Sequence, residues 1–252
     1  MNKGFATALV LLLIVAFVAI SIGSAVFIIY TNNTNKIIDS TSQPRNISQT
    51  TDDTNQIVQK NSALQQLLDK MKSYKNYQVD ITLASGKTTT NWKILRVNNK
   101  QSQEDTGHPS LIITYKDLNQ GKSYSYLKES NKYMEDQLSN SEFNIGTPEY
   151  YFKDWTNNTK IKGEDTLNGE KVTVYEDLYS DVSRAGYINS ETGLPIKTYR
   201  KSATGESTIT FKFSRINEVQ EKEVTIPSTA KQFSAQEMEQ GKQFLDNITG
   251  GR

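Results

Sequence analysis

The chain has 252 residues and no cysteine, with 29 basic side chains, 28 acidic side chains and one histidine. The lack of cysteine excludes disulfides, thiolate metal ligands, a cysteine nucleophile and a lipidated N-terminal cysteine, and a single histidine leaves little room for a zinc site. Only Lys3 among the charged residues precedes residue 31, so the remainder is neutral and lacks the basic excess typical of nucleic-acid binding.

The first segment, residues 5–30, carries no charge and is dense in Leu, Val, Ile, Ala and Phe. A helix needs about 20 apolar residues to cross the hydrocarbon core of a membrane. Residues 1–30 are therefore predicted to form one N-terminal transmembrane anchor. Because Lys3 and the amino terminus precede it, the positive-inside rule favours a cytoplasmic N-terminus, a single pass through the cell membrane and an extracytoplasmic domain.

Two other interpretations of this segment stay open. A cleaved secretory signal usually has a shorter apolar region of about 7–15 residues, but the small residues 23–25 would offer a cleavage site. Residues 3–5 also resemble the processing site of type IV prepilins, although Leu9 stands where that family normally has glutamate. An uncleaved anchor and a cleaved signal both export the domain that follows.

Residues 31–55 consist mostly of Thr, Asn, Ser, Gln and Asp. Such a composition buries too little apolar area to offset the entropy of ordering, so this stretch is predicted to be a flexible linker. The domain itself is assigned to residues 56–252. Its first element is a predicted helix over residues 56–74, because Ile57, Leu64, Leu68 and Met71 lie on one face. That face would pack on the domain core or, alternatively, bind a partner or a membrane surface.

From residue 77 the apolar period changes to two, which indicates strands. Val79, Ile81 and Leu83 alternate with polar residues, and Asn168-Gly169 is a typical hairpin turn. Repeated short alternating runs favour an antiparallel meander with one apolar and one wet face. Further strands are predicted over about 91–97, 111–116, 122–128, 172–176, 186–189, 196–201 and 207–214.

Two helical pieces complete an α+β domain. Residues 148–155 begin with proline and are rich in aromatic side chains, which suggests a short helix lying as a lid over the sheet. A C-terminal helix is marked by a capping box from Ser234 to Glu237 and by apolar residues up to Ile248, and it would end at Gly250.

No arrangement of residues indicates catalysis. His108, the one possible base of a Ser/His/Asp triad, lies in a predicted loop. Residues 165–169 lack the ligand spacing of a calcium loop. The pair Glu104-Asp105 would point to opposite faces of a strand. We therefore predict no enzyme, no catalytic residue, no cofactor and no metal site.

Apolar and aromatic side chains of the strands and the lid are the candidates for lining a ligand cavity. The same residues could simply pack in the core, because both roles require the same alternation. The candidates are Val79, Ile81, Leu83, Tyr124, Tyr126, Trp155, Val172, Val174, Ile209, Phe211 and Phe213.

Over about residues 56–233, and most closely in its second half, the chain resembles the periplasmic lipoprotein-carrier and lipoprotein-sorting superfamily, the LolA-like proteins. The similar stretches are 167–172 (LNGEKV), 186–197 (GYINSETGLPIK), 209–213 (ITFKF) and 224–227 (VTIP). Asn189 stands where that family usually has an acidic residue. The resemblance implies a curved antiparallel sheet, an open half-barrel covered by helices, whose concave apolar face can hold acyl chains. This chain would be a membrane-anchored variant.

The sequence thus predicts a membrane-tethered extracytoplasmic binding protein that holds a lipid, an acyl chain or another apolar ligand. Its expected partners are the membrane, through residues 5–30, and a lipid or lipidated protein, with an envelope protein as a further possibility. The alternative is a non-catalytic interaction or sensor module of the cell envelope without a small-molecule ligand.

Overall fold

The computed structural model describes residues 64–107, 111–152, 155, 159–179 and 181–240. The predicted anchor, the predicted linker, His108 and the end of the C-terminal helix lie outside these residues. Within them, no helix is long and apolar enough to cross a membrane. Described residues up to 232 form one unit, while residues 233–240 belong to a second one.

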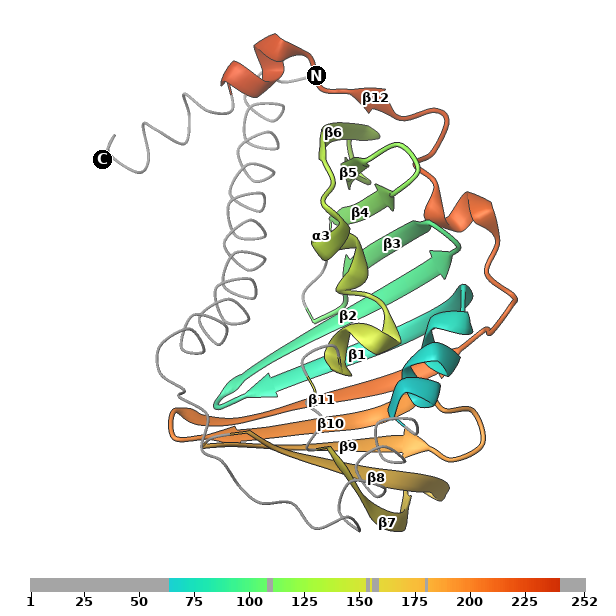
Figure 1. Cartoon of the computed structure of the whole chain (residues 1–252). Helices are drawn as coiled ribbons and strands as arrows, with labels where there is room; N and C mark the ends of the chain where they lie inside the picture. Colours follow the sequence, from blue (N-terminus) through green and yellow to red (C-terminus); the bar gives the residue numbers. More distant parts are fainter. Residues whose placement is uncertain (1–63, 108–110, 153–154, 156–158, 180, 241–252) are drawn as a thin grey trace, which may run out of the picture. The chain divides into compact units, whose positions relative to one another are not determined.

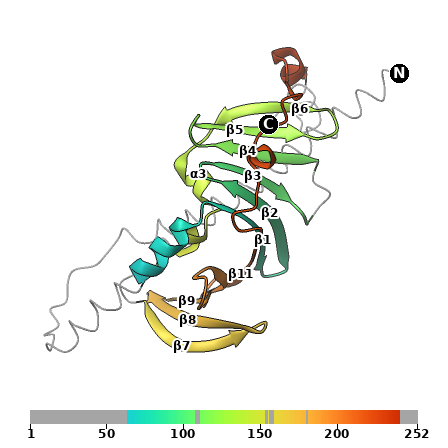
Figure 2. The same cartoon turned by 90° about the vertical axis from the view of Figure 1, so that its right-hand side faces the viewer.

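Twelve strands of the described residues form one curved, open sheet (Figures 1 and 2). The first six are β1 (Asn76–Ser85), β2 (Thr88–Val97), β3 (Lys100–Asp105), β4 (Ile112–Asp117), β5 (Lys122–Leu127) and β6 (Lys132–Gln137). The others are β7 (Lys160–Leu167), β8 (Glu170–Tyr179), β9 (Val182–Asn189), β10 (Pro195–Ser202), β11 (Gly205–Ser214) and the short β12 (Lys231–Gln232).

The sheet consists of two meanders joined along one seam. Strands β1 to β6 follow one another in space, strands β7 to β11 do the same, and β1 pairs with β11. All these pairs are antiparallel, and only the two-residue β12 runs parallel to its neighbour β6. The predicted antiparallel meander is therefore confirmed, as a mostly antiparallel open sheet with few helices.

The predicted hairpin between β7 and β8 is present. Asn168 and Gly169 have φ angles of 55° and 84°. A two-residue turn with positive φ at both positions matches the right-handed twist of the flanking strands, and asparagine and glycine tolerate that region best.

Four strands were not predicted: β3, β6, β7 and the two-residue β12. β3 has the sequence KQSQED and β6 the sequence KYMEDQ, so neither has the apolar alternation that marks a strand. β7 (KIKGEDTL) lies at one end of the sheet, where charged residues protect an unpaired edge. These strands have regular backbone structure but lack the apolar alternation on which the prediction depended.

The helices agree with the prediction in part. A helix covers residues 64–73, and its Leu67 and Met71 are buried, as the predicted apolar face requires. The predicted helix at Pro148 is a 3₁₀ helix, η1 (Pro148–Phe152), which ends before Trp155. A short α3 (Asn140–Asn144), with a capping box from Ser139 to Glu142, was missed.

Two helical elements follow β11. The 3₁₀ helix η2 (Glu221–Val224) buries Val224. In the second unit, a helix begins at residue 235. Its predicted capping box is confirmed, because the Ser234 amide donates to the Glu237 carboxylate at 2.9 Å and the Glu237 amide donates to the Ser234 hydroxyl at 3.2 Å.

The topology explains why one face of the sheet is covered. β6 and β7 lie toward opposite ends of the sheet, so the chain between them must cross a face. The described residues 139–152 and 155, with α3 and η1, lie over this face, and the helix at 64–73 lies on the same side (Figures 1 and 2). We call residues 139–152 and Trp155 the covering segment and the face beneath it, which includes Val79, Ile81 and Phe211, the covered face.

Candidate functional site

The second half of the covering segment packs on the sheet with aromatic rings. The Tyr151 ring lies 4.9 Å from that of Phe211, and Phe152 lies 5.0 Å from Trp155. Gly186 of β9 makes room for them, since a Cβ atom there would lie 2.8 Å from Phe152 and 2.9 Å from Trp155. A glycine in this strand therefore serves close packing.

These rings belong to two buried clusters on the covered face. The first joins the helix at 64–73, through Leu67 and Met71, to Phe152, Tyr175 and Ile188. The second is centred on the seam between the two meanders, and Tyr151 packs against it as well. Its buried members are Tyr77, Val79, Ile81, Ile94 and Phe211.

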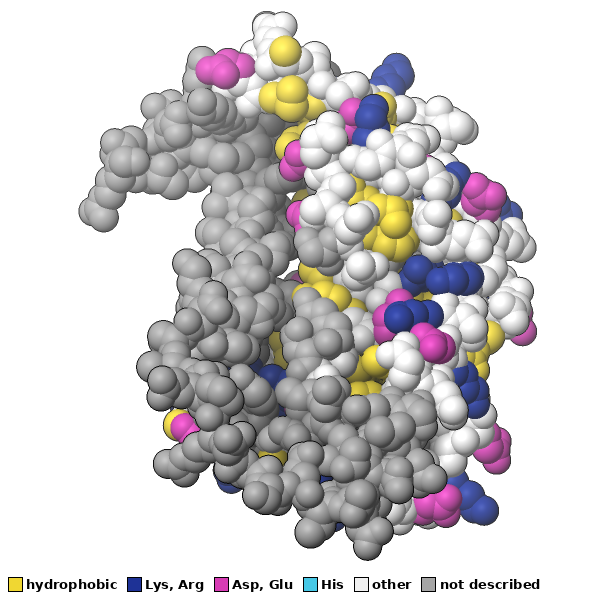
Figure 3. Space-filling model, viewed as in Figure 1, with side chains coloured by type: hydrophobic (Ala, Val, Ile, Leu, Met, Phe, Trp, Pro, Cys, Tyr) yellow, Lys and Arg dark blue, Asp and Glu magenta, His cyan; other side chains and the backbone are white. Residues whose placement is uncertain are grey.

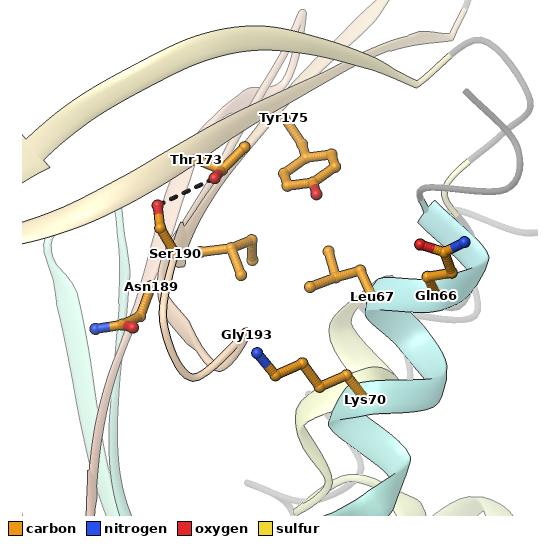
Figure 4. Close-up of a pocket in the computed structure, with 9 residues that line it drawn as sticks. Gln66, Leu67, Lys70, Thr173, Tyr175, Asn189, Ser190 and Gly193 are labelled. Atoms are coloured by element: carbon orange, nitrogen blue, oxygen red, sulfur yellow. Dashed lines mark hydrogen bonds between the residues drawn. The ribbon is translucent and has the colours of Figure 1, made fainter. Parts of the chain in front are cut away.

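A pocket of about 240 Å³ opens beside the first cluster, between the helix at 64–73 and strands β8 and β9 (Figure 4). Leu67, Tyr175 and Ile188 supply its apolar floor. Polar residues and one glycine form the rest of its lining: Gln66, Lys70, Thr173, Asn189, Ser190 and Gly193. We call the three apolar residues the floor of the pocket and the other lining residues its rim.

The turn between β9 and β10 builds one wall of this pocket. The Asn189 side-chain oxygen accepts hydrogen bonds from the amides of Glu191, at 3.0 Å, and Thr192, at 2.8 Å. Gly193 closes the turn with a φ angle of 72°. An asparagine oxygen can accept these bonds as an aspartate oxygen does, so Asn189 keeps the turn that an acidic residue would form.

The helix at 64–73 is fastened to the same turn. The Lys70 ammonium donates to the Glu191 carbonyl at 2.7 Å, and the Tyr74 hydroxyl donates to the Thr192 carbonyl at 2.9 Å. Both walls of the pocket are therefore held by direct hydrogen bonds between segments about 120 residues apart in the chain.

The first half of the covering segment meets a different surface. Tyr77, Arg96, Gln101 and Lys116 are cross-strand partners on β1 to β4 and form a straight row, which we call the polar row. All four side chains are buried. They lie under α3 and the residues after it, because Tyr77 donates to the Gly146 carbonyl at 3.0 Å and Lys116 donates to the Glu142 carbonyl at 3.0 Å.

Burial changes the acidity of this row. It lowers the pKa of Lys116 to about 8, because the charged ammonium loses its hydration, and the nearby Glu142 offsets this only in part. Burial also raises the pKa of Tyr77 to about 12, against the opposing effect of the Arg96 guanidinium. Arg96 itself lies over the Phe143 ring at 5.1 Å.

Gln101 differs from the other members of the polar row in its lack of side-chain hydrogen bonds in the part of the chain that the structure describes. It is fully buried, and within the described residues neither its amide nitrogen nor its amide oxygen has a hydrogen-bond partner. Gly146 leaves room for this amide, since a Cβ atom at residue 146 would lie 2.7 Å from it. An unsatisfied buried polar group costs about 1–3 kcal/mol.

The structure divides the predicted ligand-lining residues between the two faces. Val79, Ile81 and Leu83 of β1 lie opposite Phe213, Phe211 and Ile209 of β11, all on the covered face. Trp155 packs instead on the first cluster, against Phe152. The register places the other four, Tyr124, Tyr126, Val172 and Val174, on the opposite face.

The eleven candidates therefore do not line one common cavity. In β8 the covered face carries Thr173 and Tyr175, because Tyr175 is the partner of Gly186, whose Cβ position faces Phe152. The sequence pattern had suggested that Val172 and Val174 face the ligand. Because side chains alternate along a strand, a shift of one residue exchanges the two faces. Sequence reasoning also missed Gln66, Lys70 and the turn at Asn189 as pocket residues.

Acidic side chains do not gather into a metal site in the part of the chain that the structure describes, where no three His, Asp or Glu residues lie together. The buried Asp177 instead faces Arg184, with 3.4 Å between oxygen and nitrogen. Large exposed apolar side chains are few among the described residues, and Figure 3 shows hydrophobic atoms in small areas between polar ones.

No protein-family model matches the sequence, and no curated protein matches it. Solved structures similar to the chain include the lipoprotein LppX of Mycobacterium tuberculosis, with 10% identity over 68% of this chain and 99% of LppX and a TM-score of 0.44. MucB of Pseudomonas aeruginosa, solved with MucA, has 13% identity over 68% of this chain and 62% of that one, with a TM-score of 0.45.

A LolA superfamily protein of Nitrosomonas europaea is a further neighbour, with 11% identity over 64% of this chain and 96% of that one and a TM-score of 0.30. One of the structural neighbours is thus a protein described as a LolA superfamily member.

Proposed function

We propose that the protein is a non-catalytic binding protein that holds an apolar or lipid moiety at the covered face of its sheet. The observation that carries this proposal is the pocket between the helix at 64–73 and strands β8 and β9, with its floor of Leu67, Tyr175 and Ile188. Pockets with apolar floors and a few polar groups at the rim are typical of ligand sites.

The size of the pocket limits what it holds. Sites for whole drug-sized ligands measure about 300–1,000 Å³, and this one measures about 240 Å³. It therefore suits part of a ligand, such as the end of an acyl chain, with the rest lying along the rim. Residues 5–30 would tether the domain to the cell membrane on its extracytoplasmic side, where lipids and lipidated proteins are at hand.

One observation favours a second function. Val79, Ile81 and Phe211, central among the predicted lining residues, are closely packed beneath Tyr151. That packing leaves the middle of the covered face filled, which suits an interaction or sensor module that binds an envelope protein without a small ligand. MucB, one of the structural neighbours, was solved in complex with the protein MucA.

Native mass spectrometry of the full chain, released from detergent, tests the proposal. The chain should bind palmitate or hexadecanol, and Thr173→Trp should abolish binding because the new ring fills the pocket that Thr173 lines. The matched control is Thr210→Trp, at an exposed position on the opposite face of the sheet. If neither palmitate nor hexadecanol binds, or if the two variants bind equally well, the interaction module would be the better supported function.

A further inference from the structure

We propose that Lys70 makes this pocket selective for an amphiphile with an anionic head group, a carboxylate or a phosphate. This inference rests on the proposed function and names the class of ligand for the same site. The apolar chain would lie on the floor formed by Leu67, Tyr175 and Ile188, and the anion would lie at the rim beside Lys70.

The charge of the lining supports an anion. Lys70 is its one cation, and none of the nine lining residues is acidic. Two nearby acidic side chains lie outside the lining: Asp69 accepts from Gln65 at 2.9 Å and lies 3.7 Å from Lys72, and the Glu170 carboxylate accepts from the lining residue Asn189 at 2.6 Å. A head group at the rim would therefore meet a positive charge without a competing carboxylate in the lining.

The position of the ammonium group is set by two contacts. Its bond to the Glu191 carbonyl, at 2.7 Å, holds the end of the side chain. The stem crosses Gly193, where a Cβ atom would lie 2.7 Å from the Lys70 Cδ atom, so a larger residue there would displace the stem. Because a lysine ammonium has three N–H groups and the structure describes a partner for one, two remain for a ligand.

The opposite side of the rim adds neutral donors. Figure 4 shows Thr173 and Ser190 across the pocket from Lys70, and their hydroxyl oxygens lie 3.1 Å apart. Each hydroxyl can turn its proton toward an anion. A carboxylate or phosphate beside Lys70 would accept a charge-assisted hydrogen bond from the ammonium, which is stronger than a neutral one, and the two hydroxyls are neutral donors for polar atoms on the other side of the rim.

The test compares palmitate with hexadecanol, which has the same chain length and no charge, on the full chain in a nonionic detergent. The unmodified protein should bind palmitate about tenfold more tightly or better, as expected for a hydrogen bond to a charged group. Lys70→Met should reduce the ratio of the two affinities to near one and leave hexadecanol binding intact. Lys70→Arg should retain the preference.

Lys72→Met is the matched control, because Lys72 lies on the same helix and faces Asp69, outside the pocket lining. If the unmodified protein binds palmitate and hexadecanol equally tightly, or if Lys70→Met leaves the ratio of the two affinities unchanged, the inference is wrong. Binding of hexadecanol would still support the proposed function. Failure of both probes to bind would overturn both. Inorganic phosphate is the third probe, and Lys70-dependent binding of phosphate as tight as that of palmitate would show that the anion alone is the ligand and would overturn the amphiphile.

Discussion

The two halves of the covering segment cross the same sheet face and hold to it by opposite means. The half from η1 to Trp155 packs with aromatic rings on Phe211 and into the space left by Gly186. The half around α3 rests on the polar row, where Lys116 and Gln101 are buried. Burial of rings stabilises directly, whereas buried polar groups only recover what they lose in hydration. The aromatic half should therefore fasten the segment, and the polar half should contribute little.

The largest expected effect is in the aromatic half. Phe152→Ala removes a fully buried ring that joins the covering segment to the helix at 64–73, and such truncations cost about 3–5 kcal/mol. Denaturant unfolding of the full chain measures it. Leu178→Ala, at a side chain that is 67% exposed, should stay within about 0.5 kcal/mol. Equal effects at both positions would mean that the ring does not fasten the segment.

The polar half should show itself in the pH dependence of stability. Because the pKa of Lys116 falls to about 8 in the folded protein from 10.5, the unfolded chain holds a proton between these pH values that the folded protein lacks. Stability should therefore rise as pH increases from about 8, by on the order of 3 kcal/mol over the full window.

Buried tyrosines limit this window. Burial raises the pKa of both Tyr77 and Tyr151 above the ordinary value of 10, so their contribution to stability is lost as pH rises beyond about 10. Thermal unfolding between pH 8 and 10 should then show the rise, and Lys116→Met should remove it. A rise that persists in Lys116→Met would place its origin in another group.

A smaller effect tests how tightly the aromatic half fits. Gly186→Ala puts a methyl group within 2.9 Å of Phe152 and Trp155, which should cost about 1–3 kcal/mol. The same change in a Phe152→Leu background should cost less, because the smaller side chain yields space. Gly107→Ala, whose nearest neighbour is the end of the Asn91 side chain at 3.3 Å, is the control. Additive effects of the two changes would argue against the close fit.

The smallest effect has the opposite sign. Gln101→Leu removes an amide without partners among the described residues and should leave stability unchanged or raise it by about 1 kcal/mol. Gln103→Leu, two residues along the same strand, should destabilise, because the Gln103 oxygen accepts from Lys116 at 3.1 Å. Thermal unfolding of the two variants measures this difference. A clear loss of stability in Gln101→Leu would mean that the Gln101 amide has a hydrogen-bond partner.

The same contrast separates what the sequence could predict from what it could not. Val79, Ile81, Phe211 and Phe213 follow the period-two pattern, and the structure pairs them in register on one face. β3 was missed because its covered face carries Gln101 and Gln103, which leave no apolar alternation. A strand that buries polar side chains is invisible to a pattern based on hydrophobicity.

The pocket was beyond prediction for another reason. Its walls are the helix at 64–73 and the turn after β9, and the bond from Lys70 to Glu191 spans 121 residues. Local patterns predicted the helix and the strands on both sides of the turn, but they say nothing about which distant elements meet. In β8, apolar residues occupy both faces, so alternation alone could not show that Tyr175 rather than Val174 faces the helix.

The seam between β1 and β11 also bears on how the chain folds. Each meander is made of hairpins between neighbouring segments, which form quickly, whereas the seam joins residues far apart in sequence and must close a long loop first. At its end, Asn76 exchanges two hydrogen bonds of 3.0 Å with the backbone of Val219, across 143 residues. Assembly of the covered face thus waits for the last strands of the chain, and a ribosome-bound product lacking β11 would hold two sheets without a common core.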